Sequence, residues 1–188
     1  KRIGENSSKF AIRKLNPRKI KSEIMTVVFD KRISKNVLSV FANAISSSAI
    51  AKGTTFLKGK EDKQIFSDDI NIIDKADIKR ANGSKYFDNE GVKIDELELV
   101  KNGVLKNLLV DTYNGKKINK KSNGRCGGTT NLFFKKGSKT FDEIINSKKK
   151  ILYINETIGH GTNLITGDYS VGASGRMIEY GELSHPVS

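Results

Sequence analysis

The most informative stretch of the chain reads GHGTNLITGDYSVGASG and runs from Gly159 to Gly175. Five of these seventeen residues are glycine, interleaved with small and hydroxylated side chains, and an apolar pattern resumes directly afterwards. Glycine permits positive φ angles and the close approach of another backbone. We therefore expect a shaped surface built from main chain, followed by a β-strand.

Short apolar segments elsewhere in the chain also predict strands. After the glycine-rich stretch, Arg176–Glu179 and Leu183–Ser184 are expected to pair as a hairpin through Tyr180-Gly181. A second hairpin is expected around Asn102-Gly103, a dipeptide that supplies the positive φ angles of a tight turn. The two strands of this hairpin are expected at Leu97–Val100 and Val104–Val110. Three single strands are expected at Ile70–Asp74, Ile151–Ile154 and Thr26–Phe29, and Thr26–Phe29 is expected to be buried.

The longest helix is expected between Ser34, a suitable N-cap, and Gly53, a suitable stop. Between them a 3.6-residue period is formed by Val37, Leu38, Phe41, Ala44, Ile45 and Ser48. A short helix is expected at Ser7–Leu15, and Thr140 with Glu143 forms a capping box that opens another. Helices and strands mix without regular βαβ alternation, so the predicted class is α+β with a mainly antiparallel sheet.

The composition bounds the class of protein. The 188 residues fit one domain or one domain with an arm, and 36% apolar residues are enough for a core. No apolar run approaches the roughly 20 residues that span a bilayer, and no signal peptide is visible. One cysteine excludes an internal disulfide and is compatible with a cytoplasmic location. Because the first residue is not Met, we expect a fragment or a processed piece.

The net charge of +13 raises the question of nucleic-acid binding. The lysines are spread along the chain, with short runs at 116–117, 120–121 and 148–150, and aromatic residues do not alternate with them. We therefore favour a solvated basic surface over a dedicated nucleic-acid face. A basic module that binds DNA, or modulates DNA gyrase, is kept as the alternative function.

Few residues are suited to catalysis. A zinc site needs three protein ligands, but the chain holds only His160, His185 and one thiol, all far apart and without a zinc motif. Cys126 sits beside Arg125, a cation able to lower a thiol pKa, and a Cys126–His160 pair is the catalytic alternative. A lone cysteine in a glycine-rich turn is more often a small filler residue, and we favour that interpretation. Gly175 directly follows Ser174, so no nucleophile elbow is present.

Two glycine-rich stretches remain, residues 159–175 and 124–130. Neither carries the Lys-Ser/Thr of a phosphate-binding loop, and each precedes a strand. Both expose main-chain donors, which suits the capture of extended peptides by strand addition. Tight turns at sheet corners explain the same glycines without a ligand.

Several motifs resemble those of the TldD/PmbA family, on its PmbA (or TldE) side. The resemblance covers about residues 20–188 and keeps the family's order and spacing. Its closing motif spans Ile165 to Val187, with ITGDYS at its start. The supporting matches are Phe87-Asp88-Asn89-Glu90-Gly91-Val92, Leu99-Val100-Lys101-Asn102-Gly103-Val104-Leu105 and Gly124-x-x-Gly127-Gly128-x-x-Asn131.

The resemblance implies a bacterial or archaeal cytosolic protein of a family first described as modulators of DNA gyrase. It implies a zinc metallopeptidase assembly in which TldD carries a His-Glu-x-x-x-His helix and PmbA is its partner around a cavity for unfolded peptides. The corresponding stretch here, Phe41–Ser48, reads FANAISSS and has neither His nor Glu. We therefore expect zinc only in a TldD-like subunit, no catalytic residue or cofactor in this chain, and a heterodimer or self-association.

The same resemblance gives the expected domain limits and peptide site. Residues 1–20 are expected to be a basic arm or interdomain remnant, and residues 21–188 a C-terminal domain that lacks the family's N-terminal α/β domain and its last strands. The peptide-binding residues are expected to present backbone and hydroxyl groups at the cavity wall. They are Gly167, Asp168, Tyr169, Ser170, Asn163 and His160.

Overall fold

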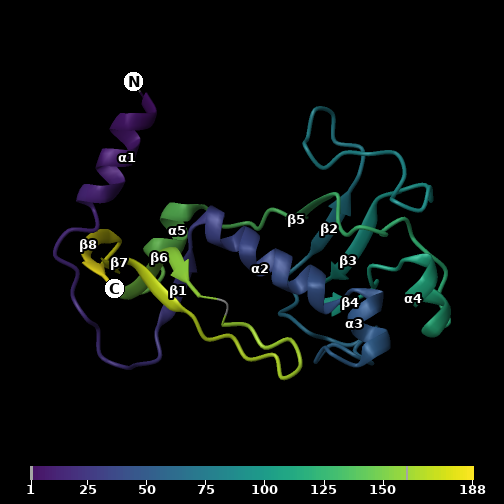
Figure 1. The fold of residues 1–188 in the computed structure, drawn as a ribbon. Coiled ribbons are helices and arrows are strands. Elements are labelled where there is room, and N and C mark those ends of the chain that lie inside the picture. Colours follow the sequence, from purple (N-terminus) through teal and green to yellow (C-terminus); the bar gives the residue numbers. More distant parts are fainter. Residues whose placement is uncertain (1, 160) are drawn as a thin grey trace. The chain divides into compact units, whose positions relative to one another are not determined.

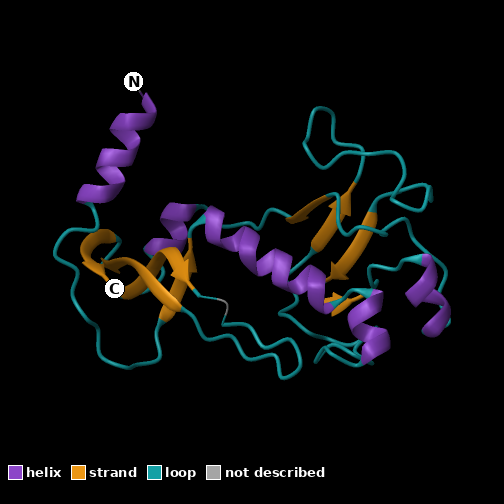
Figure 2. Cartoon of the chain, viewed as in Figure 1, coloured by secondary structure: helices purple, strands orange, loops and turns teal. Residues whose placement is uncertain are grey.

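The structure is a computed structural model that describes residues 2–159 and 161–188. Helices and strands mix along the chain, and the two sheets are mostly antiparallel, which confirms the predicted α+β class (Figures 1 and 2). The elements are α1 (Arg2–Ile12), β1 (Thr26–Phe29), α2 (Lys31–Ala44), α3 (Ser47–Lys52), β2 (Ile72–Lys75), β3 (Leu97–Lys101), β4 (Val104–Leu105), α4 (Thr112–Lys117), β5 (Asn131–Phe134), α5 (Phe141–Ile145), β6 (Lys150–Ile158), β7 (Gly172–Glu179) and β8 (Glu182–Val187).

The chain forms two compact units. The first contains residues 1–36, 138–161 and 170–188, and the second contains residues 37–137 and 162–169. Within the described residues, no helix is both long and apolar enough to cross a membrane.

The first unit is built on a four-stranded sheet in the order β1-β6-β7-β8. β1 lies parallel to β6 and the other pairs are antiparallel, with Ile151 of β6 opposite both Thr26 and Ile178. Ile151 and Ile178 are fully buried, whereas most of β1 is exposed at the sheet edge. The prediction that Thr26–Phe29 is buried is therefore wrong, because an edge strand packs on only part of its surface.

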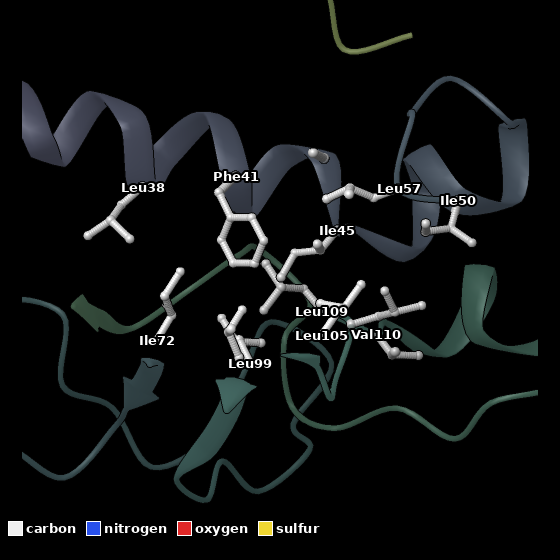
Figure 3. Packing of buried hydrophobic residues seen from close by; sticks show 13 residues of the cluster. Leu38, Phe41, Ile45, Ile50, Leu57, Ile72, Leu99, Leu105, Leu109 and Val110 are labelled. Atoms are coloured by element: carbon white, nitrogen blue, oxygen red, sulfur yellow. The ribbon is translucent and has the colours of Figure 1, made fainter. Parts of the chain in front are cut away.

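The second unit is built on a four-stranded antiparallel sheet in the order β4-β3-β2-β5. Leu38 and Phe41 of α2, and Ile45 directly after it, point toward this sheet, where they meet Ile72 and Leu99 (Figure 3). Each fully buried side chain of this kind contributes about 1.5–3 kcal/mol relative to exposure. This core fixes one face of α2 and leaves the opposite face for other contacts.

The long helix predicted between Ser34 and Gly53 differs from the structure at both ends. It begins four residues earlier because Asp30, not Ser34, caps it: the carboxylate of Asp30 accepts the Arg32 N–H at 2.9 Å. It also breaks after Ala44. Ser46 takes an extended conformation and its hydroxyl accepts the Ala49 N–H at 3.3 Å, so a second helix, α3, starts at Ser47.

The two predicted hairpins are confirmed. Asn102 and Gly103 have φ angles of 46° and 74° between β3 and β4, and Tyr180-Gly181 joins β7 to β8. The capping box at Thr140 is also present and opens α5. The strand predicted at Val104–Val110 ends at Leu105, and the N-terminal helix lies at Arg2–Ile12 instead of Ser7–Leu15. Helix α4, which Asp111 caps, was not predicted.

Candidate functional site

A polar groove of about 380 Å³ lies in the second unit, between the C-terminal end of α2 and the loop that precedes β5. We call it the α2 groove. Small side chains form one wall and a glycine-rich turn forms the other. Its main lining residues are Ala42, Asn43, Ser46 and Ser47 on the helical side, Gly127, Gly128 and Thr129 on the loop side, and Asp111.

The helical wall follows from the pattern of α2. Phe41 and Ile45 point into the core (Figure 3), Ala42 packs at its edge, and Asn43 is exposed. The break after Ala44 then brings Ser46 beside them. This wall therefore carries only methyl, hydroxyl and carboxamide groups.

Asp88 shapes the loop wall by accepting three backbone bonds. One carboxylate oxygen accepts the N–H groups of Glu90 and Val92 at 2.9 and 3.0 Å, and the other accepts the Cys126 N–H at 2.8 Å. Burial alone would raise the pKa of Asp88, but these bonds outweigh it, and the pKa lies below its ordinary 3.8. Asp88 thus ties two loops together as an anion.

A buried ion pair also holds this loop in place. The side chains of Arg125 and Asp74 are fully buried, with Nε of Arg125 2.6 Å from a carboxylate oxygen of Asp74. The other Asp74 oxygen accepts from the backbone N–H and hydroxyl of Thr130 at 2.8 and 2.9 Å, and Arg125 also donates to the Asp95 carbonyl at 2.8 Å. The loop is therefore anchored at both of its ends.

Between these anchors, the turn presents free main-chain donors. Gly127 and Gly128 have φ angles of 91° and 96°, and a Cβ at Gly127 would collide with the Asn89 side chain. Over the described residues, the N–H groups of Gly127 and Thr129 have no acceptor. Across the groove, the Asn43 carboxamide also has no partner within that part of the chain. These groups are available to a ligand.

The donor set of the groove does not fit zinc. Asp111 is the one carboxylate among the lining residues, and it already accepts from Ser47 at 2.7 Å and from Asn114 at 2.7 and 2.9 Å. Burial would raise the pKa of Asp111, but the bonds from Asn114 and Ser47 hold it below its ordinary 3.8. Among residues 2–159 and 161–188, no three His, Cys, Asp or Glu residues are placed to hold a metal ion.

Comparison with known proteins places the chain in a family. The PmbA/TldA metallopeptidase C-terminal domain matches residues 22–188. The chain belongs to this family. Two curated relatives, both named as metalloprotease PmbA homologues, come from Haemophilus influenzae and Buchnera aphidicola. Each is 34% identical over 99% of this chain, which spans 42% of each relative's length.

Solved structures of the PmbA/TldD family share the fold. A proposed modulator of DNA gyrase from Bacteroides thetaiotaomicron superposes with a TM-score of 0.92 at 33% identity, over 98% of this chain and 42% of its own. TldE from Thermococcus kodakarensis superposes with a TM-score of 0.78 at 21% identity, over 97% of this chain and 44% of its own, and shows the fold alone.

Of the family motifs, Gly124–Asn131 lies on the loop wall of the α2 groove, and the 87–92 motif contacts that wall. Asp88 joins the two loops, Gly127 passes close to Asn89, and the Asn131 carboxamide donates to the Lys75 carbonyl at 2.8 Å. From the sequence, residues 124–130 were expected to expose main-chain donors, whereas the 87–92 motif was only a mark of resemblance. Sequence reasoning missed Asn43 and Thr129 as site residues, although the quoted stretches 41–48 and 124–131 lie on the two walls.

The loop predicted to bind peptide is held by its own polar groups. The Asn163 side chain accepts the Ile165 and Thr166 N–H groups at 3.0 and 3.4 Å, and the Thr166 hydroxyl donates to Asp168 at 2.6 Å. Gly167 lies against the Phe56 ring, where a Cβ would approach to 3.1 Å.

The remaining predicted residues fall in different places. Tyr169 belongs to the same unit as this loop and is 44% exposed, whereas Ser170 belongs to the first unit, where its N–H donates to the Gly161 carbonyl. His160 lies outside the described residues, and so does the proposed pairing of His160 with Cys126.

The alternative of an activated Cys126 thiol is not supported. Burial raises its pKa above the ordinary value, and the negative charges of Glu90, Asp88 and Asp111 raise it further. The neighbouring Arg125 does not offset this, because its guanidinium is turned into the core and paired with Asp74. The thiol is therefore kept protonated, which disfavours a nucleophilic role.

Proposed function

We propose that this chain is an accessory component of a TldD/PmbA-type metallopeptidase system in the cytoplasm, and that it holds an extended peptide without cleaving it. The observation that carries the proposal is the chemistry of the α2 groove. The stretch that resembles the zinc helix of TldD lines this groove with Ala42, Asn43, Ser46 and Ser47. The curated relatives' names, as metalloproteases, support the link to proteolysis.

The groove suits the main chain of a peptide better than any one side chain. Peptide carbonyls need donors, and the N–H groups of Gly127 and Thr129 and the Asn43 carboxamide provide them from the two walls. Recognition through backbone bonds tolerates many sequences, which is what a system acting on unfolded peptides requires.

The hydrolytic step would come from a TldD-like partner subunit. A catalytic zinc uses three protein ligands and activates a bound water, and the α2 groove does not supply such ligands. This chain's residues would instead bind and orient the peptide. We further propose that the loop predicted from the sequence forms a second peptide contact, with Gly167, Asp168, Tyr169, Ser170, Asn163 and His160 as its residues.

Filling the groove tests this proposal. We expect Asn43→Trp to weaken binding of an unstructured, fluorescently labelled peptide at least tenfold, or about 1.4 kcal/mol, because the indole occupies the space and removes a donor. Fluorescence anisotropy measures the affinity. Asn36→Trp is the matched control, since Asn36 is an exposed asparagine two turns earlier on α2 and outside the groove. Equal affinity for both variants would contradict the proposal.

A further inference from the structure

Helices α3 and α4 bring together two segments that are far apart in the sequence and unusually basic. Residues 47–60 and 112–121 contain seven lysines and no aspartate or glutamate. The two helices contact each other (Figure 1). The lysines of the two segments form what we call the lysine patch, which consists of Lys52, Lys58, Lys60, Lys116, Lys117, Lys120 and Lys121.

Most of the positive charges in the lysine patch are not neutralised by a carboxylate. Lys117 Nζ lies 4.1 Å from the centre of the Tyr113 ring. Hydrogen bonding and charge from Lys117, together with the charge of Lys52, lower the pKa of Tyr113, so both helix ends contribute to one positive field. Lys120 pairs with Glu61 at 2.8 Å. The other six lysines have no carboxylate within 4.0 Å in the described part of the chain.

The patch lies one helix length from the α2 groove. Ser47, at the start of α3, and Asp111, which caps α4, both line the groove and are joined by a bond of 2.7 Å. Lys52 and Lys117 end the same two helices. Six helical residues span about 9 Å. An extended peptide covers that distance in about three residues.

We infer that the α2 groove and the lysine patch together select extended peptides that carry acidic residues about three positions from the segment in the groove. This rests on the proposed function and names its substrate class. Charge complementarity is the basis, because the patch offers exposed ammonium groups with no competing carboxylates in either segment. An acidic peptide fits better than nucleic acid, since the patch has no arginine for bidentate phosphate contacts and Lys117 covers the ring of Tyr113.

The test compares labelled peptides of equal length, one neutral, one with three aspartates and one with three lysines, by fluorescence anisotropy at low ionic strength. We expect the acidic peptide to bind roughly three- to tenfold more tightly than the neutral one, as two or three exposed ion pairs would give. Added salt should remove this preference and leave neutral binding unchanged. Equal affinity for all three peptides would overturn the inference.

Two double variants separate the patch from overall charge. Lys116→Ala with Lys117→Ala should abolish the acidic preference. Lys148→Ala with Lys149→Ala should keep it, although the net charge falls equally and these lysines are also exposed. An equal loss in both variants would overturn the inference, and so would displacement of the acidic peptide by a single-stranded oligonucleotide of the same charge.

The same measurements distinguish this inference from the proposed function. If the neutral peptide binds and Asn43→Trp weakens that binding, the groove holds a peptide, whatever the result for the acidic peptide. If the neutral peptide does not bind, the proposed function fails. Acidic binding that Asn43→Trp leaves unchanged would then show a patch independent of the groove and would overturn the inference as well.

Discussion

Replacing Arg125 with alanine is expected to lower the free energy of unfolding by about 3–5 kcal/mol, because it leaves Asp74 charged, buried and without its cation. Both side chains are fully buried, so water cannot take the place of the guanidinium without opening the core. Arg125 also donates to the carbonyls of Asn123 and Asp95 at 3.0 and 2.8 Å, and the substitution would leave both carbonyls without this donor. Urea unfolding followed by far-UV circular dichroism measures the effect.

The control for Arg125→Ala removes both charges. Arg125→Met combined with Asp74→Asn keeps an acceptor for the N–H and hydroxyl of Thr130 and leaves no unpaired ion. We expect this double variant to be clearly more stable than Arg125→Ala alone, since buried pairs contribute little net energy while a single buried charge is costly. A single variant as stable as the wild-type chain would show that the pair is not closed in solution.

Replacing Asp88 with alanine is expected to cost about 2–4 kcal/mol, because three backbone N–H groups lose a charged acceptor. Asp88 is 4% exposed, and its bond to Cys126 connects two loops that are far apart in sequence. Peptide affinity should fall as well, since the Cys126 amide positions the turn that carries Gly127. Urea unfolding and anisotropy report the two effects separately.

The pH dependence of stability checks the role of Asp88 as an anion. Its folded pKa lies below the ordinary 3.8, so its contribution is complete above about pH 5 and is lost as the pH falls through 3.8 and below. Asp88→Asn keeps one acceptor oxygen and removes the titration. We expect this variant to be less stable than the wild-type chain at pH 7 and to lose less stability on acidification. An unchanged acid slope would contradict the assignment.

Local signals in the sequence were enough to predict several elements correctly. The turn at Asn102-Gly103 and the capping box at Thr140 with Glu143 depend on residues within three positions of one another, and both are present as predicted. The core face of α2 also followed from a regular period of apolar residues. Such patterns are read from one segment at a time.

The predictions that were wrong concern features that depend on contacts between residues far apart in the sequence. The long helix breaks at Ser46 because that residue bridges to Leu109 and the Ser47 N–H donates to the Leu109 carbonyl at 2.8 Å. Nothing near Ser46 in the sequence indicates this partner. The buried partner of Arg125 lies 51 residues away, so the sequence suggested that its charge would act on Cys126.

In the candidate site, too, local motifs were predictable from the sequence and contacts between distant segments were not. Family motifs marked the loop wall and the end of α2 without showing that they face each other across one groove. The lysines looked dispersed because α3 and α4 are about sixty residues apart in the chain, although the fold brings them into contact. Composition alone therefore favoured a uniform basic surface.

Native mass spectrometry of the purified chain, incubated with zinc and an unfolded peptide, measures whether this chain holds a peptide without cleaving it. We expect a one-to-one complex with intact peptide, and no zinc retained after dialysis. Stoichiometric, tightly held zinc together with cleavage of the peptide by this chain alone would contradict it.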